Sequence, residues 1–297
     1  MQGKLMMADD NFPQILRDFV PDVGVLYFEG DLTLLQNRCI AIVGSRKCTQ
    51  YGKTVAKTIG KRAAENGVTV VSGLARGIDT AGHLGALEAG GKTIAVLGGG
   101  TEHYYPPENR KLQQQIAREG LLLSEHEPEY IAKAYDFPKR NRLISALSES
   151  VVVVEAPNRS GALITAECAE EQGKNVYAVP GNITSYYSFG TNKLIRENAT
   201  PLILIDDIFL DLNISPYIKE DNLLELGEDE RRVFEVVKNC GEVTIDEIYH
   251  KTNIKPSEIN GIITILEMKG IIFYKVLKNT GLYKIYLLKG TKKVLFA

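Results

Sequence analysis

The sequence has no tryptophan, only four cysteines and four histidines, and no long apolar run in its 297 residues. No stretch approaches the ~20 apolar residues that a membrane-spanning helix requires. The cysteines lack CxxC spacing and the histidines are equally scattered, so neither a zinc site nor a disulfide framework is indicated. The start, MQGKLMMADDNF, carries acids and no apolar signal core. We therefore expect a cytoplasmic protein without membrane spans or a bound metal.

A strong excess of one charge is also missing, because 35 lysines and arginines face 37 aspartates and glutamates. Binding of nucleic acid through overall charge is therefore not expected, although a fold can concentrate a positive field in one cleft. The hydrophobic content of 44% and the length are typical of a globular protein with one large and one small domain.

Motifs of common catalytic sites are missing as well. There is no HExxH, no GxGxxG, and no P-loop, since Lys47 stands where the glycine before YGKT (51–54) would be required. His83 has no histidine or cysteine near it and is interpreted as a structural residue. We expect no catalytic residue and no cofactor, and hence no enzyme.

A repeating pattern of short apolar runs and helical stretches is present from Cys39 onward. The runs lack alternation of apolar and polar residues, and helices of roughly 10–18 residues separate them, which indicates a parallel sheet covered on both faces. We predict an α/β fold, a Rossmann-like, doubly wound, mostly parallel sheet over residues 39–210, with its last strand at 202–205. Residues 1–38 are expected to form an irregular lead-in segment.

The pattern changes near Asp206. An acidic stretch rich in turn formers predicts a linker at 211–227. Residues 228–297 then show three short helical patterns, with Thr244 as an N-cap, and a hairpin that turns at 279–281. Three helices and a hairpin predict a small C-terminal winged-helix domain.

The charge of this C-terminal region supports two interpretations. Seven lysines and no acid occur from Lys269 to Lys293, and a basic wing could contact DNA. The expected recognition helix, at about 256–269, carries Glu258 and Glu267, which is unfavourable for a helix in the major groove. A protein contact or a regulatory role is an equal alternative.

Glycine-bearing loops follow most of the expected strands, and in a parallel sheet these loops meet at one edge. In the first loop, Gly44 allows close approach of a ligand, the next helix offers free N–H groups to an anion, and Arg46 adds a planar cation. A tight turn with an exposed arginine is equally compatible with this loop alone. In the second loop, Asp79 is expected to cap the helix and to pair with Arg76.

The stretch FPKRNR, at 137–142, places three cations and an aromatic ring before the run VVVVEA. Alone, it is either a solvated loop or a loop with an anionic partner. Together with Ser160 and Gly161, which open another helix after a strand, it suggests a groove for a phosphate chain.

Seven blocks resemble, in sequence and spacing, the DNA-processing protein family DprA, also called Smf. They are IAIVGSRKCTQYGKTVA, VVSGLARGIDTAGHLGAL, TIAVLGGGTEHYYPPEN, LLLSEHEP, FPKRNRLISALS, VVVVEAPNRSGALITA and VYAVPGNITSYYSFGTNKLI. The resemblance covers roughly residues 22–210, and the C-terminal region resembles the winged-helix module of many members. Departures are Gly82 in place of the usual alanine, FGTN in place of GCN, and an N-terminal part too short for the helical domain of many members.

This resemblance implies a protein that binds and protects single-stranded DNA, forms a homodimer through the Rossmann-like domain and loads the RecA recombinase during natural transformation and homologous recombination. It implies that FPKRNR neutralises phosphates while Phe137 stacks on a base, a contact worth ~1–3 kcal/mol. The predicted DNA-binding residues are Gly44, Ser45, Arg46, Gly73, Arg76, Gly77, Phe137, Lys139, Arg140, Asn141, Arg142, Ser160 and Gly161.

Two other functions stay open. Nucleotide phosphoribohydrolases carry a motif of the form PGGxGTxxE, and APNRSGALITAE would place Glu167 in the acidic position without the glycine pair. A module that senses a small nucleotide is the other alternative.

Overall fold

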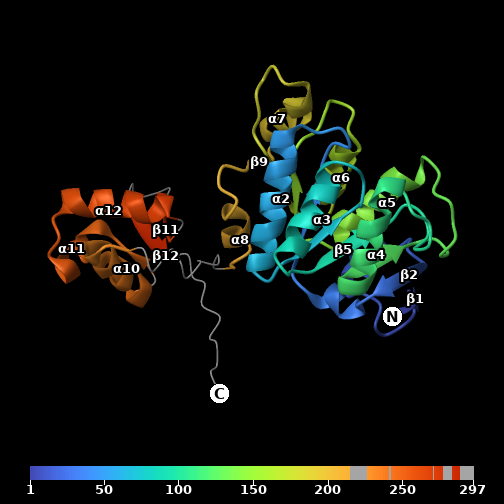
Figure 1. Ribbon diagram of the computed structural model, residues 1–297, viewed down its shortest axis with the longest axis horizontal. Helices are drawn as coiled ribbons and strands as arrows, with labels where there is room; N and C mark the ends of the chain where they lie inside the picture. The colour runs from blue at the N-terminus through green and yellow to red at the C-terminus, as the bar shows by residue number, and fades with distance from the viewer. Residues whose placement is uncertain (215–225, 241, 270, 277–282, 288–297) are drawn as a thin grey trace. The chain divides into compact units, whose positions relative to one another are not determined.

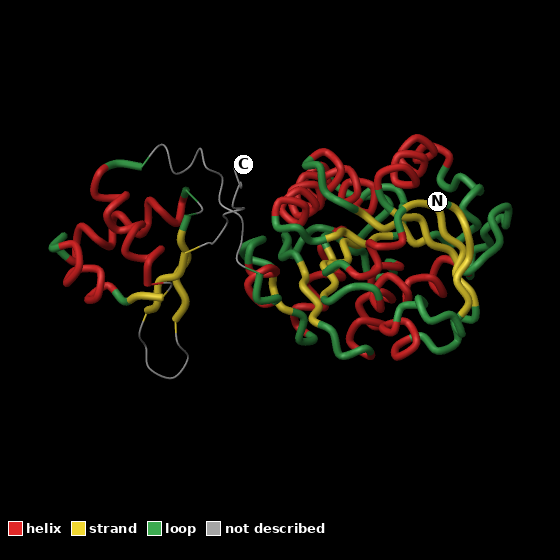
Figure 2. Tube along the Cα trace, turned by 90° about the horizontal axis from the view of Figure 1, so that it is seen from below, coloured by secondary structure: helices red, strands yellow, loops and turns green. Residues whose placement is uncertain are grey.

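The computed structural model describes residues 1–214, 226–240, 242–269, 271–276 and 283–287. These form two compact units, Met1–Leu212 and Asn213–Ala297. The first unit is a nine-stranded sheet with helices on both faces (Figures 1 and 2), which confirms the predicted α/β class. Within the described ranges, none of the helices has the length and apolar character needed to cross a bilayer.

The central sheet explains why the strands showed no alternation. Its order is β1 (Gln2–Met6), β2 (Val25–Gly30), β6 (Leu121–Ser124), β5 (Thr93–Val96), β4 (Thr69–Ser72), β3 (Cys39–Val43), β7 (Ser150–Val153), β8 (Asn175–Ala178) and β9 (Thr200–Pro201). The seven strands that follow β2 in this order, from β6 to β9, are parallel. Every residue of β3, β4, β5, β6 and β7 is buried. The strand order reverses between β3 and β7, which makes the carboxyl end of this pair the expected ligand site.

Helices cover the sheet in two layers. Right-handed crossovers place α2 (Gln50–Glu65), α3 (Ile78–Glu88) and α4 (Arg110–Glu119) on one face, and α5 (Asp136–Ala146), α6 (Gly161–Glu171) and α7 (Phe189–Arg196) on the other. The two side-chain clusters agree with this division. In β5, Ala95 belongs to the cluster with α4, whereas Ile94 and Val96 belong to the cluster with α5 and α6.

The N-terminal segment differs from the expectation of an irregular lead-in. Strands β1 and β2 pair with each other, and β2 pairs antiparallel with β6. Between them, the short helix α1 (Gln14–Phe19) buries Leu16 in the main core. The expectation was wrong because only alternate residues of β2 are buried and its partner β6 lies far along the chain. The strand expected at 202–205 is also absent, and the shorter β9 ends before it.

The second unit contains the elements expected of it. These are α10 (Glu228–Cys240), β10 (Glu242–Val243), α11 (Ile245–Thr252), α12 (Pro256–Met268), β11 (Ile272–Val276) and β12 (Tyr283–Leu287), with β12 antiparallel to both β10 and β11. Thr244 caps α11 in a reciprocal capping box with Glu247, as the sequence predicted for the cap. The assignment as a winged helix stays a prediction.

Parts of three predictions about the C-terminal region lie outside the described residues. The first is the linker, of which residues 215–225 are not described. The second is the hairpin turn at 279–281. The third is the set of seven lysines, of which four are not described, namely Lys278, Lys289, Lys292 and Lys293.

Candidate functional site

A cleft of about 750 Å³ opens at the carboxyl edge of the parallel strands. Val43 and Gly44 line it from the end of β3, and Pro157 lines it from the loop after β7. The cleft therefore lies at the point where the strand order reverses, as the topology predicts. Further lining residues come from α5, from the start of α6 and from the short helix η3 (Tyr186–Ser188).

The cleft brings together most of the residues predicted from the sequence. Eight of the thirteen line it, namely Gly44, Ser45, Arg46, Phe137, Arg140, Asn141, Ser160 and Gly161. Gly73 and Arg76 line a small adjoining cavity of about 10 Å³, which shares Arg46 and Phe137 with the cleft. Gly77, Lys139 and Arg142 line neither space.

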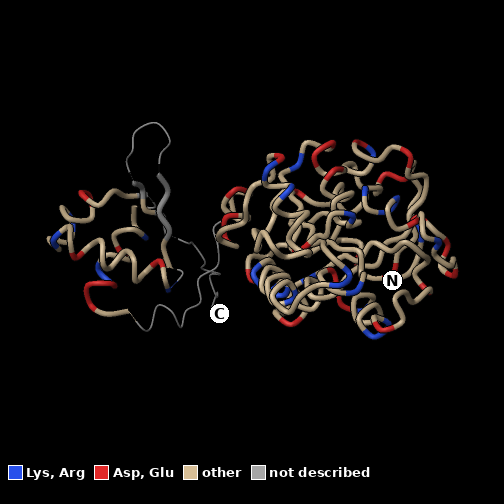
Figure 3. Tube along the Cα trace, turned by 90° about the horizontal axis from the view of Figure 1, so that it is seen from above, with Lys and Arg blue, Asp and Glu red and all other residues tan. Residues whose placement is uncertain are grey.

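The cleft has a local excess of positive charge. Arg46, Lys47 and Arg159 line it with exposed side chains, and none of them has an ion pair within the described part of the chain. Among its described lining residues the one acid is Asp79, which is buried beside Arg140. Elsewhere on this unit, acidic and basic residues are interspersed (Figure 3). The excess therefore belongs to the cleft, and a focused field of this kind attracts an anion.

Lys47 and Arg159 were missed by the sequence analysis. Both flank predicted contacts, since Lys47 follows Arg46 and Arg159 precedes Ser160. Their position in loops that follow a strand was the signal that could have found them.

FPKRNR is part of helix α5 rather than a loop. Because a helix repeats every ~3.6 residues, Phe137, Arg140, Asn141 and Ile144 share one face, and all four line the cleft. Lys139 and Arg142 lie away from that face. The expectation that the whole basic stretch faces one groove was therefore wrong.

The two cations outside the cleft have acidic partners. Arg142 donates to both oxygens of Glu125, at 2.7 and 2.8 Å, and to Asp22 at 2.9 Å. Lys139 lies 3.7 Å from Glu125. These contacts join α5 to the loops after β6 and before β2.

Arg140 is 5% exposed and forms its contacts within the protein. Its guanidinium donates to the carbonyl oxygens of Gly73, at 2.9 Å, and of Val96. Burial lowers its pKa to about 10, so the group is charged at neutral pH, and it faces the buried carboxylate of Asp79. Arg140 thus holds the ends of β4 and β5 together, and a contact with phosphate stays a prediction.

Asp79 and Arg76 are not partners, contrary to expectation. Asp79 accepts hydrogen bonds from the backbone N–H groups of Gly73 (3.2 Å) and Ala75 (3.3 Å), and burial raises its pKa. Arg76 instead pairs with Glu108 at 2.8 Å. The carboxylate therefore organises the loop after β4 from inside.

Two glycines in this loop are required by close packing. Gly77 has a φ of +79°, and a Cβ there would collide with the carbonyl oxygen of Ser45. A Cβ on Gly73 would lie 2.5 Å from the guanidinium of Arg140. They let two loops and a buried side chain approach one another, and the predicted contact of both glycines with DNA stays a prediction.

Internal groups occupy part of the start of α2, where free N–H groups were expected, and the hydroxyl of Thr49 accepts from the N–H of Gly52 at 3.1 Å. Glu155, 3% exposed at the end of β7, accepts from the backbone N–H of Thr49 at 2.8 Å and from its hydroxyl at 2.5 Å. Its own carbonyl oxygen accepts from the N–H of Ser45 at 2.7 Å. An internal carboxylate therefore occupies the position of the anion and fixes the loop that carries Arg46.

Phe137 is half-buried in a column of stacked groups. The guanidinium of Arg46 lies over its ring, 5.1 Å from the centroid, and the ring of Tyr105 lies 5.1 Å away at a tilt of 37°. His103 stacks on Tyr105 at 6.4 Å. Two protein groups therefore already contact the ring of Phe137, which leaves less of it open to a base.

The residues considered for catalysis lie outside the cleft. Glu167 is exposed on α6 and is not among the residues that line the cleft. His83 is buried with Nδ1 2.6 Å from the hydroxyl of Thr93, and burial lowers its pKa to about 3, which fits a structural role.

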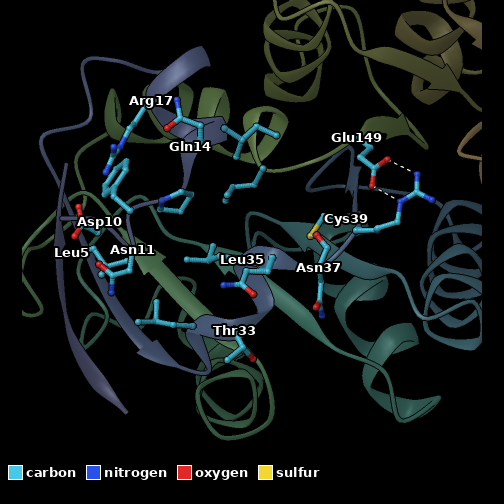
Figure 4. Close-up of a pocket in the computed structure, with 17 residues that line it drawn as sticks. Leu5, Asp10, Asn11, Gln14, Arg17, Thr33, Leu35, Asn37, Cys39 and Glu149 are labelled. Atoms are coloured by element: carbon cyan, nitrogen blue, oxygen red, sulfur yellow. Dashed lines mark hydrogen bonds and ion pairs between the residues drawn. The ribbon is translucent and has the colours of Figure 1, made fainter. Parts of the chain in front are cut away.

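A second cavity, of about 650 Å³, lies at the opposite edge of the sheet (Figure 4). Cys39 lines it at the start of β3. Arg38 and Glu149 also line it, and Arg38 donates two hydrogen bonds to the carboxylate of Glu149. Ligands of open parallel sheets bind at the carboxyl ends of the strands. The cleft with Arg46 is therefore the better candidate for the functional site.

Comparison with known proteins agrees with this architecture. The family model for DNA recombination-mediator protein A matches residues 4–213. The chain belongs to this family. It is 44% identical over 207 residues to the DNA processing protein DprA of Bacillus subtilis, covering 69% of this chain and 70% of that protein. It is 45% identical over 194 residues to DprA of Streptococcus pneumoniae, covering 65% and 68%.

Solved structures of family members share the fold. The X-ray structure of DprA from Streptococcus pneumoniae matches with a TM-score of 0.68 and 40% identity, over 70% of this chain and 74% of that chain. DprA from Helicobacter pylori, in a structure that describes its single-stranded DNA binding mode, matches with a TM-score of 0.63 and 32% identity. That match covers 71% of this chain and 95% of the other.

Proposed function

We propose that the cleft at the carboxyl edge of the sheet binds single-stranded DNA, and that the protein serves DNA processing in recombination and transformation. The observation that carries this proposal is the set of three exposed cations, Arg46, Lys47 and Arg159, around a cleft that also presents aromatic rings. Cations that track a backbone and rings that stack on bases are the two components of a site for single strands.

Membership of the family and the likeness to the Helicobacter pylori protein support the same ligand. The occupied start of α2 and the position of Glu167 outside the cleft give no support to a nucleotide hydrolase. Stacking and phosphate contacts tolerate any sequence, so we expect little sequence preference.

The test is fluorescence anisotropy of a labelled oligothymidine over a series of salt concentrations. The double variant Arg46→Gln, Lys47→Gln should bind more weakly, and its log–log salt slope should be smaller by ~0.7 for each phosphate contact removed. Lys139→Gln, a basic residue outside the cleft, is the matched control and should bind like the wild type. Equal binding by all three proteins would refute the assignment of the cleft.

We further propose that the protein acts in the cytoplasm as a homodimer formed by the α/β unit and loads RecA onto the bound strand without catalysing a reaction of its own. Analytical ultracentrifugation tests the dimer. Strand exchange by RecA on DNA coated with a single-strand-binding protein, with and without this protein, tests the loading. A rate of exchange unchanged by the protein would contradict it.

A further inference from the structure

We infer that Tyr186 is a second base-stacking side chain of the cleft, carried on a loop that the fold holds in place. The inference rests on the proposed function and extends it to a residue that the sequence analysis did not select. Tyr186 begins the short helix η3 after β8, and it lines the same cleft as Phe137.

The ring of Tyr186 is open to a ligand. Its side chain is 69% exposed, and its one described aromatic contact is with Tyr187, at 5.6 Å between centroids and an interplanar angle of 80°. Phe137, in contrast, is already contacted by Arg46 and by Tyr105. A base can therefore stack on Tyr186 without displacing a protein group.

The backbone around Tyr186 is anchored at both ends of its loop. The carbonyl oxygen of Tyr187 accepts from the N–H of Ala156 at 2.8 Å, and the carbonyl oxygen of Ala156 accepts from the N–H of Gly190 at 2.7 Å. The side chain of Asn192 exchanges two hydrogen bonds with the backbone of Gly181, at 3.2 and 3.0 Å. An exposed ring on a fixed backbone loses little conformational freedom when it binds.

The spacing of the strands separates the two rings along the edge of the sheet. Phe137 packs against Gly98 after β5, whereas the loop of Tyr186 follows β8 and bonds to the end of β7. With ~4.8 Å between neighbouring strands, three to four steps correspond to roughly 15–20 Å. A stacked strand rises ~3.4 Å per nucleotide, so roughly five nucleotides cover this distance and fewer do if the strand is extended.

The charges around Tyr186 favour a nucleic acid over a protein partner. The cleft that it lines carries the exposed cations Arg46, Lys47 and Arg159, and its one acid among the described lining residues is buried. A flexible polyanion with flat apolar faces matches both the cations and the ring. The nearby exposed side chains of Ile183 and Phe189 make a protein contact the competing outcome of the test.

The experiment compares Tyr186→Leu and Tyr186→Phe with the wild type. Tyr51→Leu is the matched control, because Tyr51 is 57% exposed on α2 and does not line the cleft. Anisotropy is measured with a thymidine dodecamer, with an abasic strand of the same length and with a thymidine dinucleotide. Circular dichroism melting establishes that each variant is folded.

We expect Tyr186→Leu to weaken binding of the dodecamer by about 5- to 150-fold, the equivalent of one stacked base. Tyr186→Phe and Tyr51→Leu should bind like the wild type, because the phenylalanine keeps the ring. The abasic strand and the dinucleotide should not distinguish Tyr186→Leu from the wild type. The salt slope should not change, since no phosphate contact is removed.

Three results would overturn the inference. If Tyr186→Leu binds the dodecamer as tightly as the wild type while the Arg46, Lys47 variant does not, the cleft binds DNA and Tyr186 has no part in it. If the abasic strand loses as much affinity as the dodecamer, the effect is not stacking. If the variant sediments as a smaller species with unchanged DNA affinity, the loop is a protein interface. A wild type that ignores every oligonucleotide refutes the proposed function as well.

Discussion

Replacement of Arg140 by methionine tests whether this cation is a structural part of the site. Methionine is long and unbranched and can fill most of the same space. It removes the positive charge beside Asp79 and both hydrogen bonds to the carbonyl oxygens of Gly73 and Val96. The carboxylate then stays buried without a cation.

The expected loss of stability is about 3–6 kcal/mol, because two hydrogen bonds from a charged donor are lost and each contributes about 1.5–3 kcal/mol. Its dependence on pH has a definite sign. Burial already raises the pKa of Asp79, and the loss of the Arg140 charge raises it further. Between the ordinary pKa of about 3.9 and this raised value, the folded variant binds a proton that the unfolded chain does not. Within this range the stability of the variant therefore falls as the pH rises, and it falls over a wider range than that of the wild type.

The assay is urea unfolding followed by hydrogen-exchange mass spectrometry on peptides from β4 and β5. These peptides report the α/β unit alone, whereas a whole-protein signal would mix two units with separate stabilities. Lys139→Met is the matched control on the same helix, and its loss should stay within ~1 kcal/mol because Lys139 is exposed and lies 3.7 Å from Glu125 in its described ion pair. Adding Asp79→Asn to Arg140→Met should recover stability, since the asparagine oxygen can still accept from Gly73 and Ala75.

The reasoning would be refuted by a loss below ~1 kcal/mol for Arg140→Met, no larger than that of the exposed control. A loss that does not change with pH would show that Asp79 does not respond to the missing charge. The first result would show that the contacts of Arg140 within the protein contribute little, so that its side chain is free to contact phosphate.

Two further predictions concern local structure. Gly77→Ala should destabilise the α/β unit by more than ~1–2 kcal/mol, because alanine is strained at this positive φ and its Cβ would meet the carbonyl oxygen of Ser45. Gly161→Ala is the control, since the space around its Cβ is open, and it should change the urea midpoint little. Equal effects of the two substitutions would contradict the packing argument. Thr244→Ala should lower the stability of the C-terminal unit by ~1 kcal/mol through loss of the capping box, measured by exchange in α11 peptides, and Thr264→Ala on the exposed side of α12 is the control.

The sequence determined the class of the fold and the edge at which the site lies. Apolar runs such as IAIV and VVVV, with helices between them, specify buried parallel strands because each pattern is local and each strand is covered on both faces. Parallel strands bring their following loops to one edge, which is why Arg46, Ser160 and Gly161 were predicted to meet before any distance was known.

The tertiary structure alone decided which of these side chains face the ligand. Helix α5 turns Arg140 inward and Arg142 away, and the sequence shows the same charge at both positions. The partner of a charged group can lie far along the chain, as when Glu155 contacts the start of α2, 106 residues from Thr49. Likewise, β2 becomes a strand through pairing with β6. Local patterns specify local structure, whereas the neutralisation of a charge and the pairing of a strand depend on contacts that only the folded chain makes.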